Sequence, residues 1–282
     1  MNKQKPLKFA HRGMAQYAPE NTLGAFKAAI EHGCEGIEID IHLSKDGIPV
    51  VVHDSWLGRL TDGADSSWIN DLTVEELKKT DLPYAGHLLP HNAPVPYPSD
   101  EGSIPHYRAE EIAKFRAEDK RNAHIMTFEE FDKWFETVKE DITVEVEFCE
   151  IGLIESMYEI LIRSKNCGRY ILFSGNTDRN NEIQSFLREK GKPEGLRLGA
   201  NIRYINEETM AFVNSADLYE VGLNDGKFTA EDVKMLEEKG IKVFSNLGDY
   251  PEWWEEMQKN GVYAFKTNYA EAYTEWLKEY EK

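Results

Sequence analysis

The chain has 282 residues, and its 33 basic and 51 acidic side chains give a formal net charge of −18 at pH 7. This acidity argues against a nucleic-acid partner and against docking on an anionic membrane surface, because both need a basic face. With 41% hydrophobic and 30% charged residues, the composition is that of a soluble globular protein with a real core.

No apolar run approaches the roughly 18 residues that a membrane-spanning helix needs, so stable membrane insertion is not expected. The segment from Met1 to Lys8 carries charge and lacks the apolar stretch of a secretory signal. The cysteines Cys34, Cys149 and Cys167 are widely spaced and odd in number, which indicates neither a disulfide framework nor a zinc motif. A cytoplasmic location is therefore expected, and the oligomeric state stays open.

Short apolar segments alternate with helical patterns along almost the whole chain, which is typical of βαβ units and a parallel sheet. The predicted strands are Lys8–His11, Gly36–His42, Pro49–His53, Ile142–Phe148, Tyr170–Ser174, Leu198–Ile202, Leu218–Leu223, Lys242–Asn246 and Tyr263–Thr267. This set contains one strand more than an eight-stranded barrel can use.

The spacing after the second strand identifies the extra one. The link from His42 to Pro49 is too short for a crossover to a parallel neighbour, and it contains the turn signal Asp46-Gly47. Val50–His53 is therefore expected to fold back as the second arm of a β-hairpin, outside the barrel. The remaining strands predict a TIM (β/α)8 barrel that forms a single domain over residues 1–282.

Helix start signals fit this alternation. Asn21-Thr22 opens an apolar pattern through Ile30, and Gly33 ends it. Thr127 with Glu130 predicts a capping box, and Thr229 with Asp232 predicts a similar start for a later helix.

A Pro- and His-rich insertion at residues 83–124, before the third barrel strand, interrupts the alternation. It holds six of the eleven prolines and four of the eight histidines, and Arg108–Lys120 is predicted to form a short charged helix within it. Long segments of this kind are either functional or peripheral. Two interpretations remain: a surface insertion, or a lid that sets specificity over the barrel mouth.

Polar side chains gather where strands are expected to end, and the C-terminal ends of barrel strands supply catalytic groups. These segments are His11-Arg12-Gly13, Glu38 with Asp40, His53-Asp54, and Glu145 with Glu147. Because side chains alternate along a strand, both members of each carboxylate pair face the barrel interior.

Carboxylates that share one barrel mouth repel each other unless a cation compensates them. Oxygen ligands favour a hard ion, which predicts Mg²⁺ or Ca²⁺ rather than zinc. The competing interpretation is a charged layer paired with lysines or arginines. No basic residue alternates with Glu38 and Asp40, which favours the metal.

Two histidines, His11 and His53, each end an apolar strand and precede a charged residue, which suits general acid–base catalysis. His42 shares the inward face of Asp40 but is predicted to be structural. Glu20-Asn21 also fits an ordinary helix start, with Asn21 as the N-cap.

Five short motifs in order resemble the glycerophosphodiester phosphodiesterase family. Its usual HRG, PENT, ExD, KDG and HD series corresponds to Ala10-His11-Arg12-Gly13, Pro19-Glu20-Asn21-Thr22, Glu38-Ile39-Asp40, Lys45-Asp46-Gly47 and Val52-His53-Asp54. A weaker likeness continues to Lys266-Thr267-Asn268-Tyr269, which is similar to a closing TDYP. The resemblance covers nearly the whole chain apart from the insertion.

The resemblance implies a metal-dependent hydrolase that converts small glycerophosphodiesters to glycerol 3-phosphate and an alcohol. By position, Glu38, Asp40 and Glu145 would hold the metal, and His11 and His53 would be the acid–base pair. The expected substrate-binding residues are Arg12, which would contact the phosphate, together with Glu20 and Glu147.

Two departures from the family pattern stand out. The family's strand usually reads Glu-x-Lys, whereas here Glu147 replaces the lysine that helps to hold the phosphate. Glu147 could be protonated, pair with an arginine of the insertion, or join the metal site. A second register would make Glu147 the ligand and place Glu145 deeper. The late strand also lacks the usual Trp and Asn, since it reads Phe244-Ser245-Asn246-Leu247.

Two other functions remain as alternatives. Some similar barrels are phospholipid-directed lyases that form a cyclic phosphate. A barrel that binds a metal or phosphate without turnover is the other, because Glu147 stands where a lysine is usual.

Overall fold

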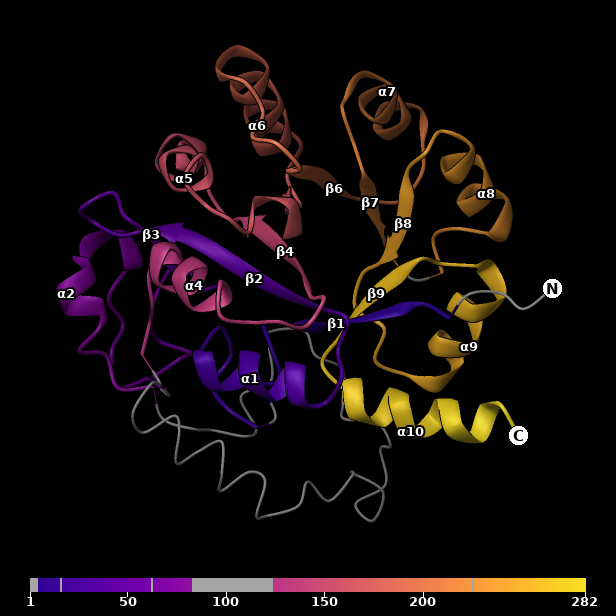
Figure 1. The fold of residues 1–282 in the computed structure, drawn as a ribbon, viewed down its shortest axis with the longest axis horizontal. Helices are drawn as coiled ribbons and strands as arrows, with labels where there is room; N and C mark the ends of the chain where they lie inside the picture. Colours follow the sequence, from indigo (N-terminus) through magenta and orange to yellow (C-terminus); the bar gives the residue numbers. More distant parts are fainter. Residues whose placement is uncertain (1–4, 16, 62, 83–123, 225) are drawn as a thin grey trace.

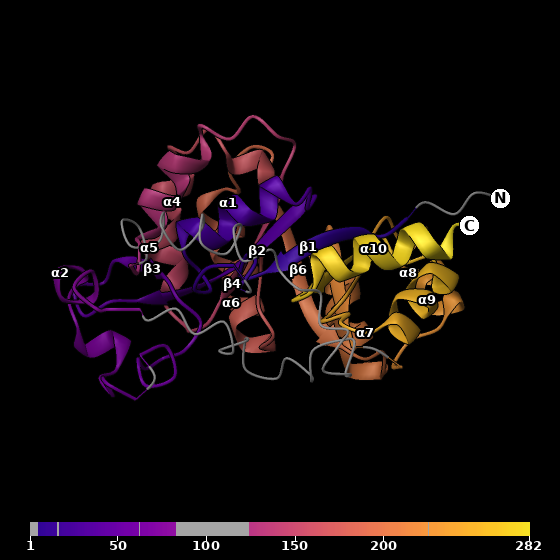
Figure 2. The same cartoon turned by 90° about the horizontal axis from the view of Figure 1, so that it is seen from below.

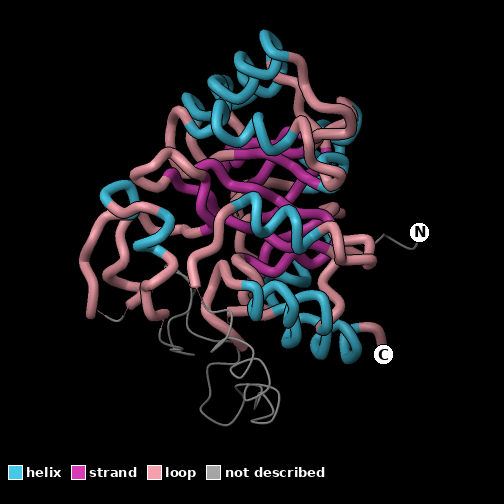
Figure 3. Tube along the Cα trace, turned by 60° about the vertical axis from the view of Figure 1, so that its left-hand side comes forward, coloured by secondary structure: helices cyan, strands magenta, loops and turns pink. Residues whose placement is uncertain are grey.

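The computed structural model describes residues 5–15, 17–61, 63–82, 124–224 and 226–282. In these residues a parallel sheet closes on itself, because β1 pairs with both β2 and β9. Helices surround the ring, as Figures 1 and 3 show. The predicted TIM barrel is confirmed. Its strands are β1 (Leu7–His11), β2 (Gly36–Leu43), β4 (Thr143–Phe148), β5 (Tyr170–Phe173), β6 (Arg197–Arg203), β7 (Glu220–Leu223), β8 (Lys242–Ser245) and β9 (Ala264–Thr267).

One strand, β3 (Pro49–Val51), runs antiparallel to β2 at the edge of the sheet, outside the barrel, and its other edge makes a single bridge to Thr127. The turn between them contains Gly47 at φ 73°, a conformation that glycine adopts without strain. The strand ends at Val51, two residues before the predicted end at His53. His53 therefore stands in the loop that follows, at the barrel mouth.

Helices link the strands and cover the outside of the ring. They are α1 (Leu23–Glu31), α2 (Val74–Leu77), α4 (Phe128–Phe135), α5 (Leu153–Leu161), α6 (Thr177–Lys190), α7 (Glu207–Ser215), α8 (Ala230–Glu238), α9 (Pro251–Asn260) and α10 (Ala270–Tyr280), with 3₁₀ turns η1 (Ile69–Asp71) and η2 (Cys167–Arg169). Last in the chain, α10 packs against β1, the first strand (Figure 2).

Local capping explains where several helices begin. Both predicted capping boxes are confirmed: Thr127 accepts from the Glu130 amide, and Thr229 accepts from the Asp232 amide. The prediction that Asn21 caps the first helix is wrong, since Thr22 is the N-cap of α1. Asn21 has φ 57° and directs its side chain elsewhere.

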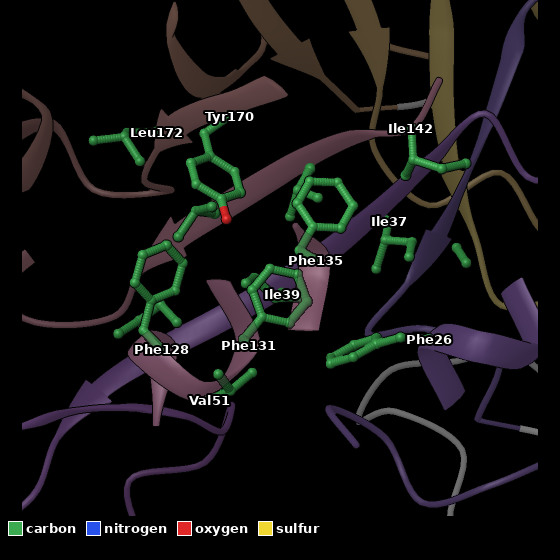
Figure 4. Packing of buried hydrophobic residues seen from close by; sticks show 14 of the residues in the cluster. Phe26, Ile37, Ile39, Val51, Phe128, Phe131, Phe135, Ile142, Tyr170 and Leu172 are labelled. Carbon is green, nitrogen blue, oxygen red and sulfur yellow. The ribbon is translucent and has the colours of Figure 1, made fainter. Parts of the chain in front are cut away.

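The core lies between the sheet and the surrounding helices. On β2, Ile37 and Ile39 face outward and join a buried aromatic cluster that contains Phe26 and Phe131 (Figure 4). The residues that alternate with these isoleucines, Glu38 among them, therefore point into the ring. The alternation predicted from the sequence thus gives this barrel an apolar outside and a charged inside.

Two predictions reach beyond the described residues. Apart from His124, the insertion at residues 83–124 lies outside them, so both its role and the single-domain organisation stay predictions. Across the part of the chain that the structure describes, no helix has the length and apolarity needed to cross a bilayer.

Phe131→Ala tests the importance of the outer core. Phe131 is fully buried, and its ring centroid lies 5.2 Å from that of Phe26 and 5.6 Å from that of Phe135. Removal of the ring should lower the free energy of unfolding by about 3–5 kcal/mol, as measured by urea denaturation. Tyr280→Ala, at an exposed ring, is the control, and equal losses in the two variants would contradict the packing described here.

Candidate active site

The first strand delivers its polar side chains through a tight turn. Arg12 and Gly13 have φ values of 57° and 76°. A Cβ at Gly13 would lie 2.8 Å from the backbone carbon of Ala25, so only glycine fits there. The turn directs the Arg12 amide toward Glu38, whose Oε2 accepts its hydrogen bond at 3.0 Å. Backbone geometry thus fixes Arg12 beside the acidic interior of the barrel.

Three carboxylates converge at the mouth. Oxygen atoms of Glu38, Asp40 and Glu147 all lie within 4.8 Å of one another. The register between β2 and β4 explains this, since Asp40 stands directly opposite Glu147. Glu38 and Asp40 are fully buried, whereas Glu147 is half-buried. This acidic cluster could hold a metal ion.

The electrostatics of the cluster fit a divalent cation. Burial, and then the neighbouring Asp40, raise the pKa of Glu38 well above its ordinary value and raise that of Glu147. Burial would also raise the pKa of Asp40, but Arg12, with Nε at 3.2 Å, and His53 hold it below its usual value. An all-oxygen donor set with mutual repulsion is the chemistry that Mg²⁺ and Ca²⁺ prefer.

The structure places Glu145 at a deeper level. It pairs in register with Glu38, and its Oε1 lies 3.1 Å from Nζ of Lys266 on β9. Lys266 also lies over the ring of Phe173, 3.9 Å from the ring centroid. The carboxylate cluster at the mouth therefore contains Glu147 and not Glu145. This matches the second register considered from the sequence, in which Glu145 lies deeper.

His11 is oriented by a neutral partner. Asn268 donates from its backbone amide and from Nδ2 to Asp249, each at 2.8 Å, so its side-chain oxygen is left to accept. Nδ1 of His11 donates to that oxygen at 2.9 Å, which leaves Nε2 as the free acceptor. Burial, and then the Arg12 charge, lower the pKa of His11 well below its ordinary value.

His53 is oriented by an anion instead. Its Nδ1 donates to Oδ1 of Asp54 at 2.6 Å, and Oδ2 of Asp54 accepts from Nε of Arg59 at 2.7 Å. Burial is the largest influence and opposes the charged imidazole, but the hydrogen bond to Asp54 and the negative charges of Asp40 and Asp54 together outweigh it and raise the pKa of His53. The two histidines therefore favour opposite protonation states.

Glu20 lies between two arginines. It accepts from Nη1 of Arg12 at 3.1 Å and from both Nη atoms of Arg59 at 2.6 and 2.8 Å. Asn21, beside it, donates to Oδ2 of Asp40 at 2.9 Å. The PENT segment thus ties the first strand's loop to the hairpin loop and positions both Arg12 and Asp40.

A cavity of about 560 Å³ opens beside the carboxylates. Its lining combines ionisable side chains with apolar surface and consists of His42, His53, Asp54, Ser55, Trp56, Arg59, Glu147, Cys149 and Arg179. Nε2 of His42 bonds the backbone oxygen of His53 at 2.9 Å, which fits the structural role predicted for His42. The cavity gives a substrate access to His53 and Glu147.

Several residues of this site were missed at the sequence level. Arg59 and Asn268 lie in segments that resemble the family, so their signal was present. Lys266 also had a signal, because it begins the segment similar to the closing TDYP and is the charged residue of β9. Arg179 and Asp249 carried none, because only the fold brings them to the mouth.

A model of one protein family matches most of the chain. Residues 11–272 match the glycerophosphoryl diester phosphodiesterase family. A glycerophosphodiester phosphodiesterase of Caldanaerobacter subterraneus is 45% identical over 92 residues, which cover 30% of this chain and 37% of that protein. Human glycerophosphodiester phosphodiesterase 1 is 45% identical over 85 residues, or 30% of this chain and 25% of that protein. These matches therefore cover no more than 37% of the length of either relative.

Solved structures agree on the fold. A glycerophosphodiester phosphodiesterase structure from Galdieria sulphuraria has a TM-score of 0.74 at 19% identity, with 99% of this chain and 100% of that chain covered. An Oleispira antarctica phosphodiesterase in complex with the product sn-glycerol-3-phosphate has a TM-score of 0.72 at 22% identity, with 97% of each chain covered. With its motifs, its barrel and a family match over residues 11–272, this chain belongs to the glycerophosphoryl diester phosphodiesterase family.

Proposed function

We propose that this protein hydrolyses glycerophosphodiesters to glycerol 3-phosphate and an alcohol. The observation that carries the proposal is the carboxylate cluster of Glu38, Asp40 and Glu147, which shares the barrel mouth with two oppositely tuned histidines. The glycerol 3-phosphate complex of the Oleispira relative supports the substrate class.

Glu38, Asp40 and Glu147 would hold a divalent cation, Mg²⁺ or Ca²⁺, because their donor atoms are all oxygens. When bound, the cation would neutralise the phosphate oxygens and lower the pKa of a bound hydroxyl or water. Glu145 is proposed to stay outside this set, because Lys266 already compensates its charge.

The chain's own residues then divide the proton transfers. His11 is neutral and its Nε2 carries no proton, so this atom accepts the proton of the attacking hydroxyl or water. His53, kept protonated by Asp54, donates a proton to the leaving alcohol oxygen. Arg12, held by Glu20 and Asp40, presents its guanidinium to the phosphate as negative charge develops there.

Two alternatives have less support: a silent barrel, which binds a metal or phosphate without turnover, and a lyase that forms a cyclic phosphate. Glu147 motivated the silent barrel as an anion beside the phosphate, and its place in the carboxylate cluster supports a metal-binding role instead. Phosphorus NMR of the product separates hydrolysis from cyclisation, since a cyclic phosphate has its own resonance.

An enzyme-coupled assay for released glycerol 3-phosphate tests the proposal. Turnover over a panel of headgroups should need added Mg²⁺ or Ca²⁺ and stop with EDTA. His11→Ala should reduce kcat by on the order of 10²–10⁴, because the proton acceptor is lost. The absence of turnover on every headgroup, in a folded protein that binds the metal, would overturn the proposed activity.

Two matched variants, Glu147→Gln and Glu145→Gln, test the metal ligands. Glu147→Gln should weaken Mg²⁺ binding by about 10- to 100-fold or more, measured by calorimetry, because it removes a charged ligand. Glu145→Gln should bind Mg²⁺ much as the parent protein does, once circular dichroism has shown that it is folded. If Glu145→Gln instead bound Mg²⁺ more weakly than Glu147→Gln, Glu145 would be the metal ligand.

Asp54→Asn tests the assignment of the two histidines through the pH dependence of kcat/KM. His53 acts when protonated, so activity should fall as pH rises through its raised pKa. Loss of the Asp54 charge should lower that pKa and move the basic limb down by on the order of one pH unit. The acidic limb reports His11, with its lowered pKa, and should stay in place as the internal control. If only the acidic limb moved, His53 would be the general base and His11 the general acid.

A further inference from the structure

The cavity beside the carboxylates offers a place for the leaving alcohol. His53 lines it, whereas His11 does not and is only 7% exposed. Since His53 protonates the leaving oxygen in the proposed function, the alcohol that departs from that oxygen extends into this cavity. The lining side chains therefore select among alcohols.

Most charged groups of the lining are already committed to partners. Arg59 gives Nε to Asp54 and both Nη atoms to Glu20. Asp54 uses one oxygen for His53 and the other for Arg59. Glu147 belongs to the carboxylate cluster and also accepts from the Gly175 amide at 3.3 Å. None of these three has a charge to spare for the alcohol.

Arg179 is the exception in the cavity wall. Its guanidinium makes one long hydrogen bond, from Nη1 to the Phe148 backbone oxygen at 3.4 Å. It forms no ion pair with a carboxylate of the described residues, although its charge contributes to the lowered pKa of Glu150. Asn176, the N-cap of α6, bonds the Arg179 amide and fixes the residue in the first helical turn. The side chain is half-buried and keeps most of its donors unused.

Trp56 supplies an apolar surface in the same wall. Its ring is packed so closely over Gly58 that a Cβ there would lie 1.8 Å from it. The residue remains 42% exposed. A flat indole suits the carbon skeleton of an alcohol, whereas a free guanidinium suits an anion that it can bind through two parallel hydrogen bonds.

We propose that Arg179 is a specificity residue that binds an anionic group on the leaving alcohol, a phosphate or a carboxylate. The preferred substrates are then glycerophosphodiesters whose alcohol carries a second negative charge. This inference rests on the proposed hydrolysis and adds to it the chemical class of the alcohol.

A matched pair of diesters gives the test: glycerophosphoglycerol with and without a phosphate on its terminal hydroxyl. The parent protein, loaded with Mg²⁺, should favour the phosphorylated diester in kcat/KM by at least about tenfold, the expected effect of a charge-assisted pair. In Arg179→Ala that ratio should fall to about 1, mainly through KM. Arg179→Lys should keep part of the preference, because it keeps the charge but not the planar fork.

The control is Arg188→Ala on the same helix. The Arg188 guanidinium donates to the backbone oxygen of Ser215 and does not line the cavity, so the substrate ratio should not change. Glycerophosphoserine, tested in the same way, shows whether a carboxylate serves as well as a phosphate.

Three results would overturn the inference: a parent ratio near 1, a preference for glycerophosphocholine, or equal effects of the Arg179 and Arg188 variants. Calorimetry of the two glycerophosphoglycerol diesters with the Mg²⁺-loaded His11→Ala protein separates this inference from the proposed function. Arg179-dependent binding without turnover in the parent would uphold the anion subsite and reject the hydrolysis.

Discussion

The structure depends on how one barrel accommodates a charged interior. Glu38, Asp40, Glu145 and Glu220 are all buried within the ring, where the charged form of each is costly. Lys266 compensates the negative charge of the deeper carboxylates, Glu145 and Glu220. Burial, and then the neighbouring Glu145, raise the pKa of Glu220 well above its usual value. At the mouth, Arg12 forms an ion pair with Asp40, but the pKa values of Glu38 and Glu147 stay raised, so the excess negative charge favours a cation there.

The same constraint separates the two histidines. A buried imidazole near Arg12 is driven toward its neutral form, and the amide of Asn268 orients it without adding a charge. On the loop after β3, Asp54 does add a charge and favours the imidazolium. Two residues of one type thus favour opposite protonation states because their burial, neighbouring charges and hydrogen-bond partners differ.

Much of the fold followed from the sequence because side-chain alternation and turn chemistry are local. The barrel strands, the capping boxes and the inward face of Glu38 all rest on residues a few positions apart. The choice between Glu145 and Glu147 could not be made in this way. It depends on Lys266, which lies 121 positions after Glu145 and reaches it only through closure of the ring. The prediction of Asn21 as an N-cap failed for the same reason, since the bond of its side chain to Asp40 is a tertiary contact.

The lysine that the motif pattern places on β4 has a counterpart elsewhere in the ring. By resemblance, position 147 would carry a lysine, and here it carries a carboxylate. A lysine stands instead at position 266 on β9, against the carboxylate of Glu145. A cation near the deep glutamate disfavours metal ligation there, while the carboxylate one layer above stands with Glu38 and Asp40 in the cluster that could hold a metal ion. The lysine and the third carboxylate of that cluster thus stand at other positions of the ring than the motif pattern would give them.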